Sequence, residues 1–157
     1  MYTALLTIHS YLRWVVLLVG LLVLARAIAG IARRRPWTPA DDGAARWFGM
    51  SLDVQMLIGL VVYIFLSPFT MPAWRDIGAA MRDATVRFVV IEHPVGMIIA
   101  IALAHIGQSR IRKHREAARR HRLALIFFGL AMLIVLVSIP WPGRPGGRAL
   151  FRGFGVE

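Results

Sequence analysis

Four long apolar blocks dominate this chain. They cover residues 5–28, 47–66, 88–107 and 123–140. About 20 helical residues, rising about 1.5 Å each, cross a hydrocarbon core about 30 Å thick. The chain is 58% hydrophobic with a mean hydropathy of +0.64, and polar residues do not break the blocks at the helical period, as they do in soluble helices. The sequence therefore predicts an all-α integral membrane protein, an up-down four-helix bundle over residues 1–143.

Charge and cysteine usage exclude several functions. The net charge is +11, but the basic residues sit in short connections between the blocks, so we predict no nucleic-acid partner. The chain has no cysteine, which excludes disulfides, thiolate metal sites and iron–sulfur clusters. The first block lacks a basic region before it and is predicted to be a retained helix, not a signal peptide. Residues 144–157 form a basic, glycine-rich tail that we expect to be poorly ordered.

The connections between blocks predict the topology. Residues 30–46 carry four arginines and residues 110–122 carry seven lysines and arginines, whereas residues 67–86 balance two arginines with two aspartates. Basic loops stay in the cytoplasm, so the prediction is a bacterial inner-membrane protein with both termini outside, in contact with membrane lipid. Asp41 and Asp42 favour a helix start near Gly43, and residues 75–87 are expected to form a short surface helix.

Two histidines lie at the same predicted depth. His9 precedes Arg26 by 17 residues and His93 precedes Arg110 by 17 residues, in helices that run in the same direction. Both imidazoles are therefore about 25 Å from the cytoplasmic boundary. The first and third helices of such a bundle are diagonal neighbours across the core. Two imidazoles that face each other there could hold a haem iron from its two sides, so His9 and His93 are the candidate metal ligands.

A second histidine pair is less regular. His105 and His121 lie at one depth if the hairpin turns near Lys113. However, His93 and His105 are 12 residues apart, which leaves them about 120° apart around the helix. His105 and His121 remain candidate ligands, with hydrogen bonding inside the bundle and the basic surface as the alternatives. His114, in the charged loop, is given no role.

Five further polar residues in or beside the blocks need an explanation, because ionisable groups in hydrocarbon are costly. Arg13 shares a helix face with His9, and Arg87 lies outward of His93. Either could neutralise a haem propionate, and the alternative for Arg13 is that its side chain extends outward to the interface. Candidates for quinone binding or proton transfer are Glu92, Asp53 and Gln55, and the alternative for the last two is helix–helix hydrogen bonding.

The chain resembles the small four-helix membrane cytochromes b of bacteria, including superoxide-oxidase-like and hydrogenase-subunit-like electron carriers. The matching segments are Ile8-His9-Ser10 with Leu12-Arg13-Trp14, Ile91-Glu92-His93, Ile106-Gly107-Gln108-Ser109-Arg110, His121 at the start of the fourth block, and Ile139-Pro140-Trp141-Pro142. The resemblance implies haem b held by His9 with His93, and a second haem held by His105 or His121. The second block has no histidine, so the second haem stays open.

The function predicted from these observations is membrane electron transfer, by exchange with quinone or a partner redox protein. If the protein is an enzyme, a quinone-linked oxidoreductase is the expected class. One alternative is an accessory subunit of a larger respiratory or photosynthetic complex. Another is a small metal-handling transporter, in which the histidines bind copper or zinc.

Overall fold

The computed structural model describes residues 1–147 and 149–151 and confirms the predicted fold class. Within those residues all regular structure is helical, and four helices are long and apolar enough to cross a membrane. They are α1 (Tyr2–Ala32), α2 (Pro39–Val61) with its π-helical continuation η1 (Val62–Leu66), α6 (His93–Arg112) and α7 (Ala117–Ser138). Short elements α5 (Ala84–Arg87) and η2 (Phe88–Glu92) lead directly into α6. The first three predicted blocks thus lie inside longer helices, whereas the fourth extends two residues beyond the end of α7 at Ser138.

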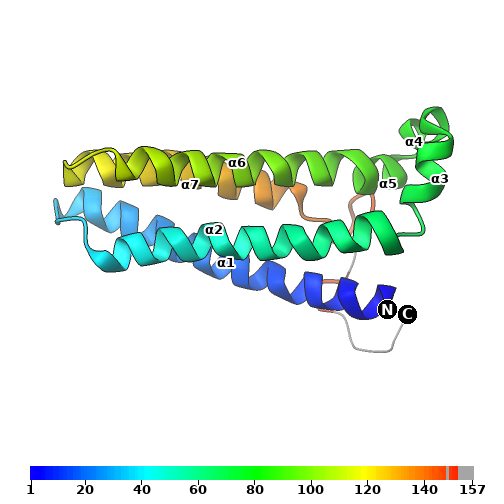
Figure 1. Cartoon of the computed structure of the whole chain (residues 1–157), viewed down its shortest axis with the longest axis horizontal. Coiled ribbons are helices and arrows are strands. Elements are labelled where there is room, and N and C mark those ends of the chain that lie inside the picture. The colour runs from blue at the N-terminus through cyan, green and yellow to red at the C-terminus, as the bar shows by residue number, and fades with distance from the viewer. Residues whose placement is uncertain (148, 152–157) are drawn as a thin grey trace.

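The helices pack in a ring in which α1 and α6 are diagonal (Figure 1). Helix α1 contacts α2 and α7, and α6 contacts α7 and α2. Small buried residues, among them Ala100, Ala104 and Ala124, line the contacts, as is usual where membrane helices approach closely. Phe48 and Phe128 meet edge to face in the core, with ring centroids 5.7 Å apart.

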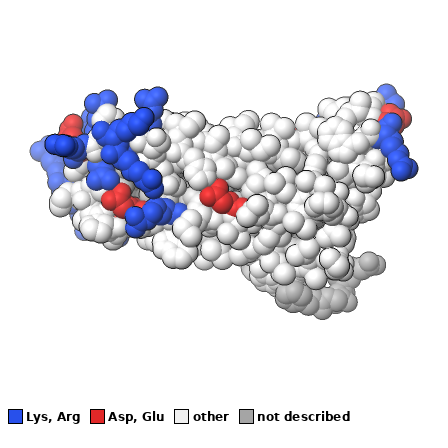
Figure 2. Space-filling view, viewed as in Figure 1, with Lys and Arg blue, Asp and Glu red and all other residues white. Residues whose placement is uncertain are grey.

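Both tight connections lie at one end of the bundle, and that end is basic. Figure 2 shows most of the visible lysine and arginine side chains gathered there, with a broad band beyond them that carries few charged residues. The α1–α2 connection, residues 33–38, ends in a capping box, because Thr38 and Asp41 each bond the backbone of the other. Helix α2 therefore begins at Pro39, and the predicted start near Gly43 was four residues late.

Asp41 fixes this connection. Its carboxylate is 2% exposed and accepts hydrogen bonds from Arg26 Nε at 2.9 Å and from Arg35 Nη1 and Nη2 at 2.8 and 2.7 Å. The backbone N–H and hydroxyl of Thr38 donate to the same carboxylate at 2.8 and 2.7 Å. The hydrogen bond to Asp41 raises the pKa of Arg35 above its ordinary value. One buried acid thus holds two arginines and a helix start together.

Three short helices cover the opposite end of the bundle, where one was predicted. They are α3 (Thr70–Arg75), α4 (Ile77–Arg82) and α5, and Figure 1 shows them clustered beyond α2 and α6. Asp76 and Asp83 separate them, and each carboxylate accepts backbone N–H groups of the helix that follows it. The aspartates that balance the loop charge are therefore also its helix caps.

A tyrosine compensates for a proline at the start of α6. Pro94 has no N–H, so the carbonyl of Val90 receives no helical hydrogen bond from it. The hydroxyl of Tyr63, from η1, donates to that carbonyl at 2.9 Å. The two π-helical segments η1 and η2 are therefore tied together directly before His93.

We expect Tyr63→Phe to lower the stability of the folded protein by about 1 kcal/mol, because a buried carbonyl loses its donor. Thermal unfolding in detergent measures this as a Tm lowered by roughly 2–4 °C. Tyr2→Phe is the control, since the Tyr2 hydroxyl makes no hydrogen bond within the described residues. An unchanged Tm for Tyr63→Phe would contradict the role of this contact.

Candidate functional site

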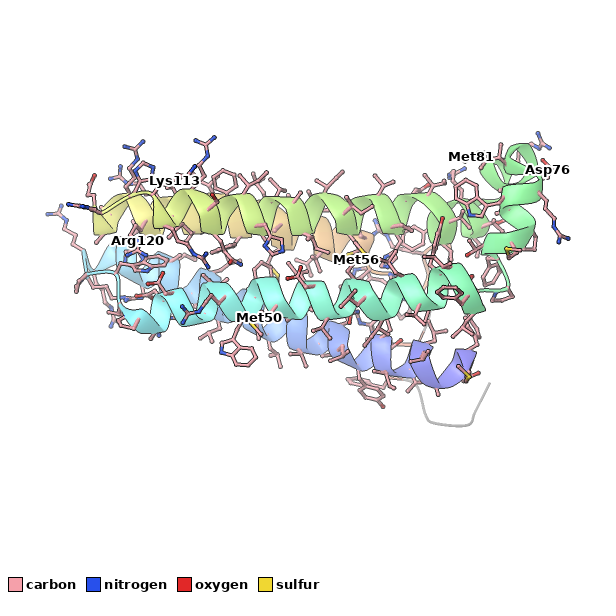
Figure 3. The ribbon with its side chains drawn as sticks, in the orientation of Figure 1. Met50, Met56, Asp76, Met81, Lys113 and Arg120 are labelled. Atoms are coloured by element: carbon pink, nitrogen blue, oxygen red, sulfur yellow. The ribbon has the colours of Figure 1, made fainter. Side chains whose placement is uncertain are left out.

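A cavity of about 140 Å³ lies at the end of the bundle away from the basic loops, between α1, α2, α6 and the end of α7. Its walls are mostly apolar, and it is partly open to its surroundings. Figure 3 shows Met56 on the inner side of α2, toward this space, and Met50 on the outer side. The polar residues that line the cavity are Tyr2, His9, Ser10, Arg13, Gln55, Tyr63, Ser67 and His93.

The two histidines predicted to share a depth face each other in this cavity. The ring centroids of His9 and His93 are 6.2 Å apart, and the ring planes are inclined by 74°. His9 comes from the first turns of α1 and His93 from the first residue of α6. The diagonal arrangement of α1 and α6 thus places both imidazoles on the bundle axis and not on the outer surface.

A backbone carbonyl sets the tautomer of His93. Its Nδ1 lies 2.7 Å from the carbonyl oxygen of Ser138, and because a carbonyl oxygen only accepts, Nδ1 carries a proton. Ser138 is the last residue of α7, where helical carbonyls lack intrahelical donors. Trp141 and Arg144 donate to the two preceding carbonyls, at 2.8 and 3.1 Å. An imidazole with Nδ1 bonded to a carbonyl is the usual state of a metal-ligating histidine.

Two residues of α2, Gln55 and Gly59, lie against His9. Gln55 Nε2 donates to the carbonyl of His9 at 2.8 Å, while Gln55 Oε1 is buried and has no hydrogen-bond partner in the described chain. One turn later, a Cβ on Gly59 would lie 3.0 Å from His9 Cε1. A larger residue at position 59 would therefore press on the imidazole.

Arg13 brings a positive charge to the cavity wall. Its side chain is buried, with the residue 7% exposed. Its Nη2 donates to the carbonyl of Leu150 at 2.8 Å, and its guanidinium lies 5.3 Å from the ring centroid of Trp14. No acidic residue of the described chain forms an ion pair with it. The cavity thus offers an anionic ligand a buried cation.

The described part of the predicted tail folds back over α1. Leu150 accepts hydrogen bonds from Arg13 and from Trp14 Nε1, and Phe151 stacks on Trp14 with ring centroids 5.4 Å apart. Gly146 lines the cavity. The prediction of poor order also covers residues 148 and 152–157, which lie outside the described residues.

The remaining candidates lie outside the cavity. Arg87 Nε donates to Glu92 Oε1 at 2.7 Å, and both side chains are exposed. His105 Nε2 lies 2.8 Å from Asp53 Oδ1, on the outer side of α2 and α6. Of the predicted residues, the structure therefore gathers His9, His93, Arg13 and Gln55 in one place and leaves Arg87, Glu92, Asp53 and His105 elsewhere.

His121 is fully buried near the basic end, apart from His105. Its ring lies 4.9 Å from that of Trp37, between centroids, and neither ring nitrogen has a hydrogen-bond partner in the described chain. A Cβ on Gly30 would overlap the His121 ring, so this glycine allows α1 and α7 to approach. The pairing of His105 with His121 remains a prediction, and each has a different neighbour here.

Sequence reasoning missed Gly59, Tyr63 and Ser138. Gly59 and Tyr63 follow the predicted Gln55 at intervals of four, the spacing of one helix face, and this pattern could have marked α2 as a cavity wall. Ser138 had a signal too, because Pro140 predicts the helix end that exposes its carbonyl.

Metal-ligating side chains do not gather in larger groups. Within residues 1–147 and 149–151 no three histidine, cysteine, aspartate or glutamate side chains are placed to hold one metal ion. The cavity therefore offers two imidazoles and no further ligands of these types.

Comparisons with protein-family models, with curated proteins and with solved structures find no match to this chain. Its residues and their arrangement establish an all-α, multi-pass membrane protein whose four membrane-length helices enclose a cavity with two facing histidines.

Proposed function

We propose that this protein is a membrane electron carrier that binds one haem b between His9 and His93. The observation that carries the proposal is the pair of facing imidazoles, 6.2 Å apart between centroids. Two metal–nitrogen bonds of about 2 Å, with about 1 Å from each nitrogen to its ring centre, give a similar span of roughly 6 Å. When bound, haem would supply a one-electron couple whose potential the ligands and their surroundings tune.

The composition of the ligand set favours haem over a bare copper or zinc ion. A structural zinc site takes four protein ligands and a catalytic one three. A porphyrin supplies four nitrogens to its iron, so the protein needs to add only two axial ligands. His9 and His93 meet that need, and the Ser138 carbonyl would hold His93 in the required tautomer.

The cavity is mostly apolar but smaller than a porphyrin, so its side chains would have to move to admit one. At about 140 Å³ the cavity is close in volume to an engineered one of about 150 Å³ that admits benzene, and a porphyrin is larger. Haem binding would therefore displace side chains. Met56 and Met97 line the wall, and methionine adapts to such changes more easily than branched residues. Arg13 would neutralise a propionate, while Arg87 is already paired with Glu92.

The distribution of charge supports an orientation. We place the basic end, with both tight connections, in the cytoplasm and both termini outside a bacterial inner membrane. The histidine cavity then lies toward the outer side, where electrons would be exchanged with a quinone or with a partner redox protein. Residues that line the cavity, Tyr2 and Pro140 among them, would then contact that partner.

One experiment tests the proposal. The full chain, expressed in a haem-replete bacterial host and purified in detergent, should show a reduced-minus-oxidised difference spectrum of haem b. A pyridine haemochrome assay should give about one haem per chain. A colourless protein that also fails to bind added hemin, or one with stoichiometric copper or zinc in place of iron, would overturn the proposal.

A further inference from the structure

An acid–base pair lies on the outer face of the bundle, within a membrane-length stretch of both its helices. His105 Nε2–H donates to Asp53 Oδ1 over 2.8 Å, and the two side chains are 50% and 43% exposed. This contact uses one carboxylate oxygen and one ring nitrogen. The other oxygen of Asp53 and Nδ1 of His105 remain available to a group that approaches from outside.

Both members of the pair lie at nearly the same depth. Asp53 is seven residues beyond Arg46 on α2, and His105 is five residues before Arg110 on α6. At about 1.5 Å per residue, the pair is roughly 8–10 Å inside the basic boundary. Ionisable side chains at membrane depth almost always face protein or a water-filled cavity. Exposure to lipid would leave the remaining polar atoms unsatisfied, at a free-energy cost.

The surface around the pair has the composition of a helix interface. On α6, the exposed residues Ala102 and Ser109 lie three and four residues from His105, on the same face. Small residues of this kind let membrane helices approach closely. On α2, Met50 and Leu57 flank Asp53 at similar intervals and are 52% and 64% exposed, and Figure 3 shows Met50 on the outer side of its helix.

We propose that this α2–α6 face binds a second copy of the same chain, with a two-fold axis along the membrane normal. Such an axis keeps depth unchanged, so Asp53 of one copy would stand level with His105 of the other. The face carries one acid and one base at one depth and is therefore complementary to itself, as a two-fold interface requires. The four side chains would satisfy one another away from lipid.

Disulfide trapping tests the proposal, because the chain has no cysteine of its own. Ala102→Cys places a single thiol beside the pair. Leu18→Cys is the matched control, since Leu18 is 67% exposed on α1 and each position lies eight residues before its basic boundary, Arg110 or Arg26. A disulfide needs Cα atoms within about 7 Å. After oxidation in native membranes, Ala102→Cys should give a cross-linked dimer and Leu18→Cys should not; equal yields would overturn the proposal.

A second variant tests the pair itself. Asp53→Leu with His105→Leu, added to Ala102→Cys, keeps the helices compatible with lipid and removes the polar contact. We expect the cross-linking yield to fall about tenfold, while His114→Gln in the same background leaves it unchanged. An unaltered yield in the leucine variant, or a cross-linked band whose mass is not twice that of the chain, would refute the proposal. None of these results depends on haem content.

Discussion

His93→Ala should lose most of the haem and its absorption spectrum, while His114→Ala should keep both. The imidazole of His93 is oriented by its hydrogen bond to the Ser138 carbonyl. Haem b has no covalent attachment to the protein, so removing one of its two proposed axial ligands would leave it held from one side only. Even the loss of an outer hydrogen bond to a metal-ligating histidine costs about 10–100-fold in affinity. We therefore expect less than about a tenth of the wild-type haem content. The measurement is a pyridine haemochrome assay per mole of purified chain.

Two additions make this test specific. Imidazole in the buffer should restore part of the spectrum of His93→Ala, because the free ring can occupy the space left by the side chain. The Tm of the haem-free wild type and of the haem-free variant should agree within a few degrees, since the lost bond to Ser138 is worth about 1 kcal/mol. Equal haem in the His93 and His114 variants would show that the facing imidazoles are not the ligands.

Asp41→Ala should be the most destabilising substitution at the start of α2. The carboxylate is 2% exposed and bonds Arg26, Arg35 and Thr38. Its removal leaves two partly exposed arginines without their acid and α2 without its capping box, and the loss of hydrogen bonds to a charged group together with a helix cap costs about 2–4 kcal/mol. Chemical unfolding in detergent should report a loss in this range, and membrane expression should fall with it.

The neighbouring aspartate is the control for this test. Asp42 pairs with Arg120 at 2.9 Å, but its side chain is 38% exposed, and such pairs contribute less than about 1 kcal/mol. Asp42→Ala should therefore change the unfolding free energy little, although it alters the net charge equally. Similar losses in the two variants would mean that charge near the start of α2 matters, and not the buried network of Asp41.

The depth of His9 and His93 could be predicted from the sequence, but their hydrogen-bond partners Gln55 and Ser138 could not. Depth follows from counting residues back to the first cytoplasmic arginine of a helix, and this needs no tertiary information. The partner of His93 Nδ1 depends on where α7 ends relative to α6, which is a property of packing. Pro140 predicts that the carbonyl of Ser138 is exposed at a helix end, but only the fold shows that His93 is its partner.

The second property that could not be predicted from the sequence is the rotation of each helix about its own axis. Asp53 and His105 were both recognised as membrane-embedded polar residues, but periodicity gives only relative angles within one helix. Whether that face turns inward or outward depends on the neighbours. The Thr38–Asp41 box differs, because its spacing of three residues was present in the sequence and could have placed the start of α2 correctly.

The end of α7 has a consequence for the order of assembly. The Ser138 carbonyl can restrain His93 only after α7 has stopped and docked beside α6, so that restraint is complete in the apoprotein. The entropy of fixing this ring is thus lost during folding and not when a ligand arrives. If haem binds as proposed, one of its two ligands would therefore already be oriented before the haem arrives, although the cavity walls would still have to move.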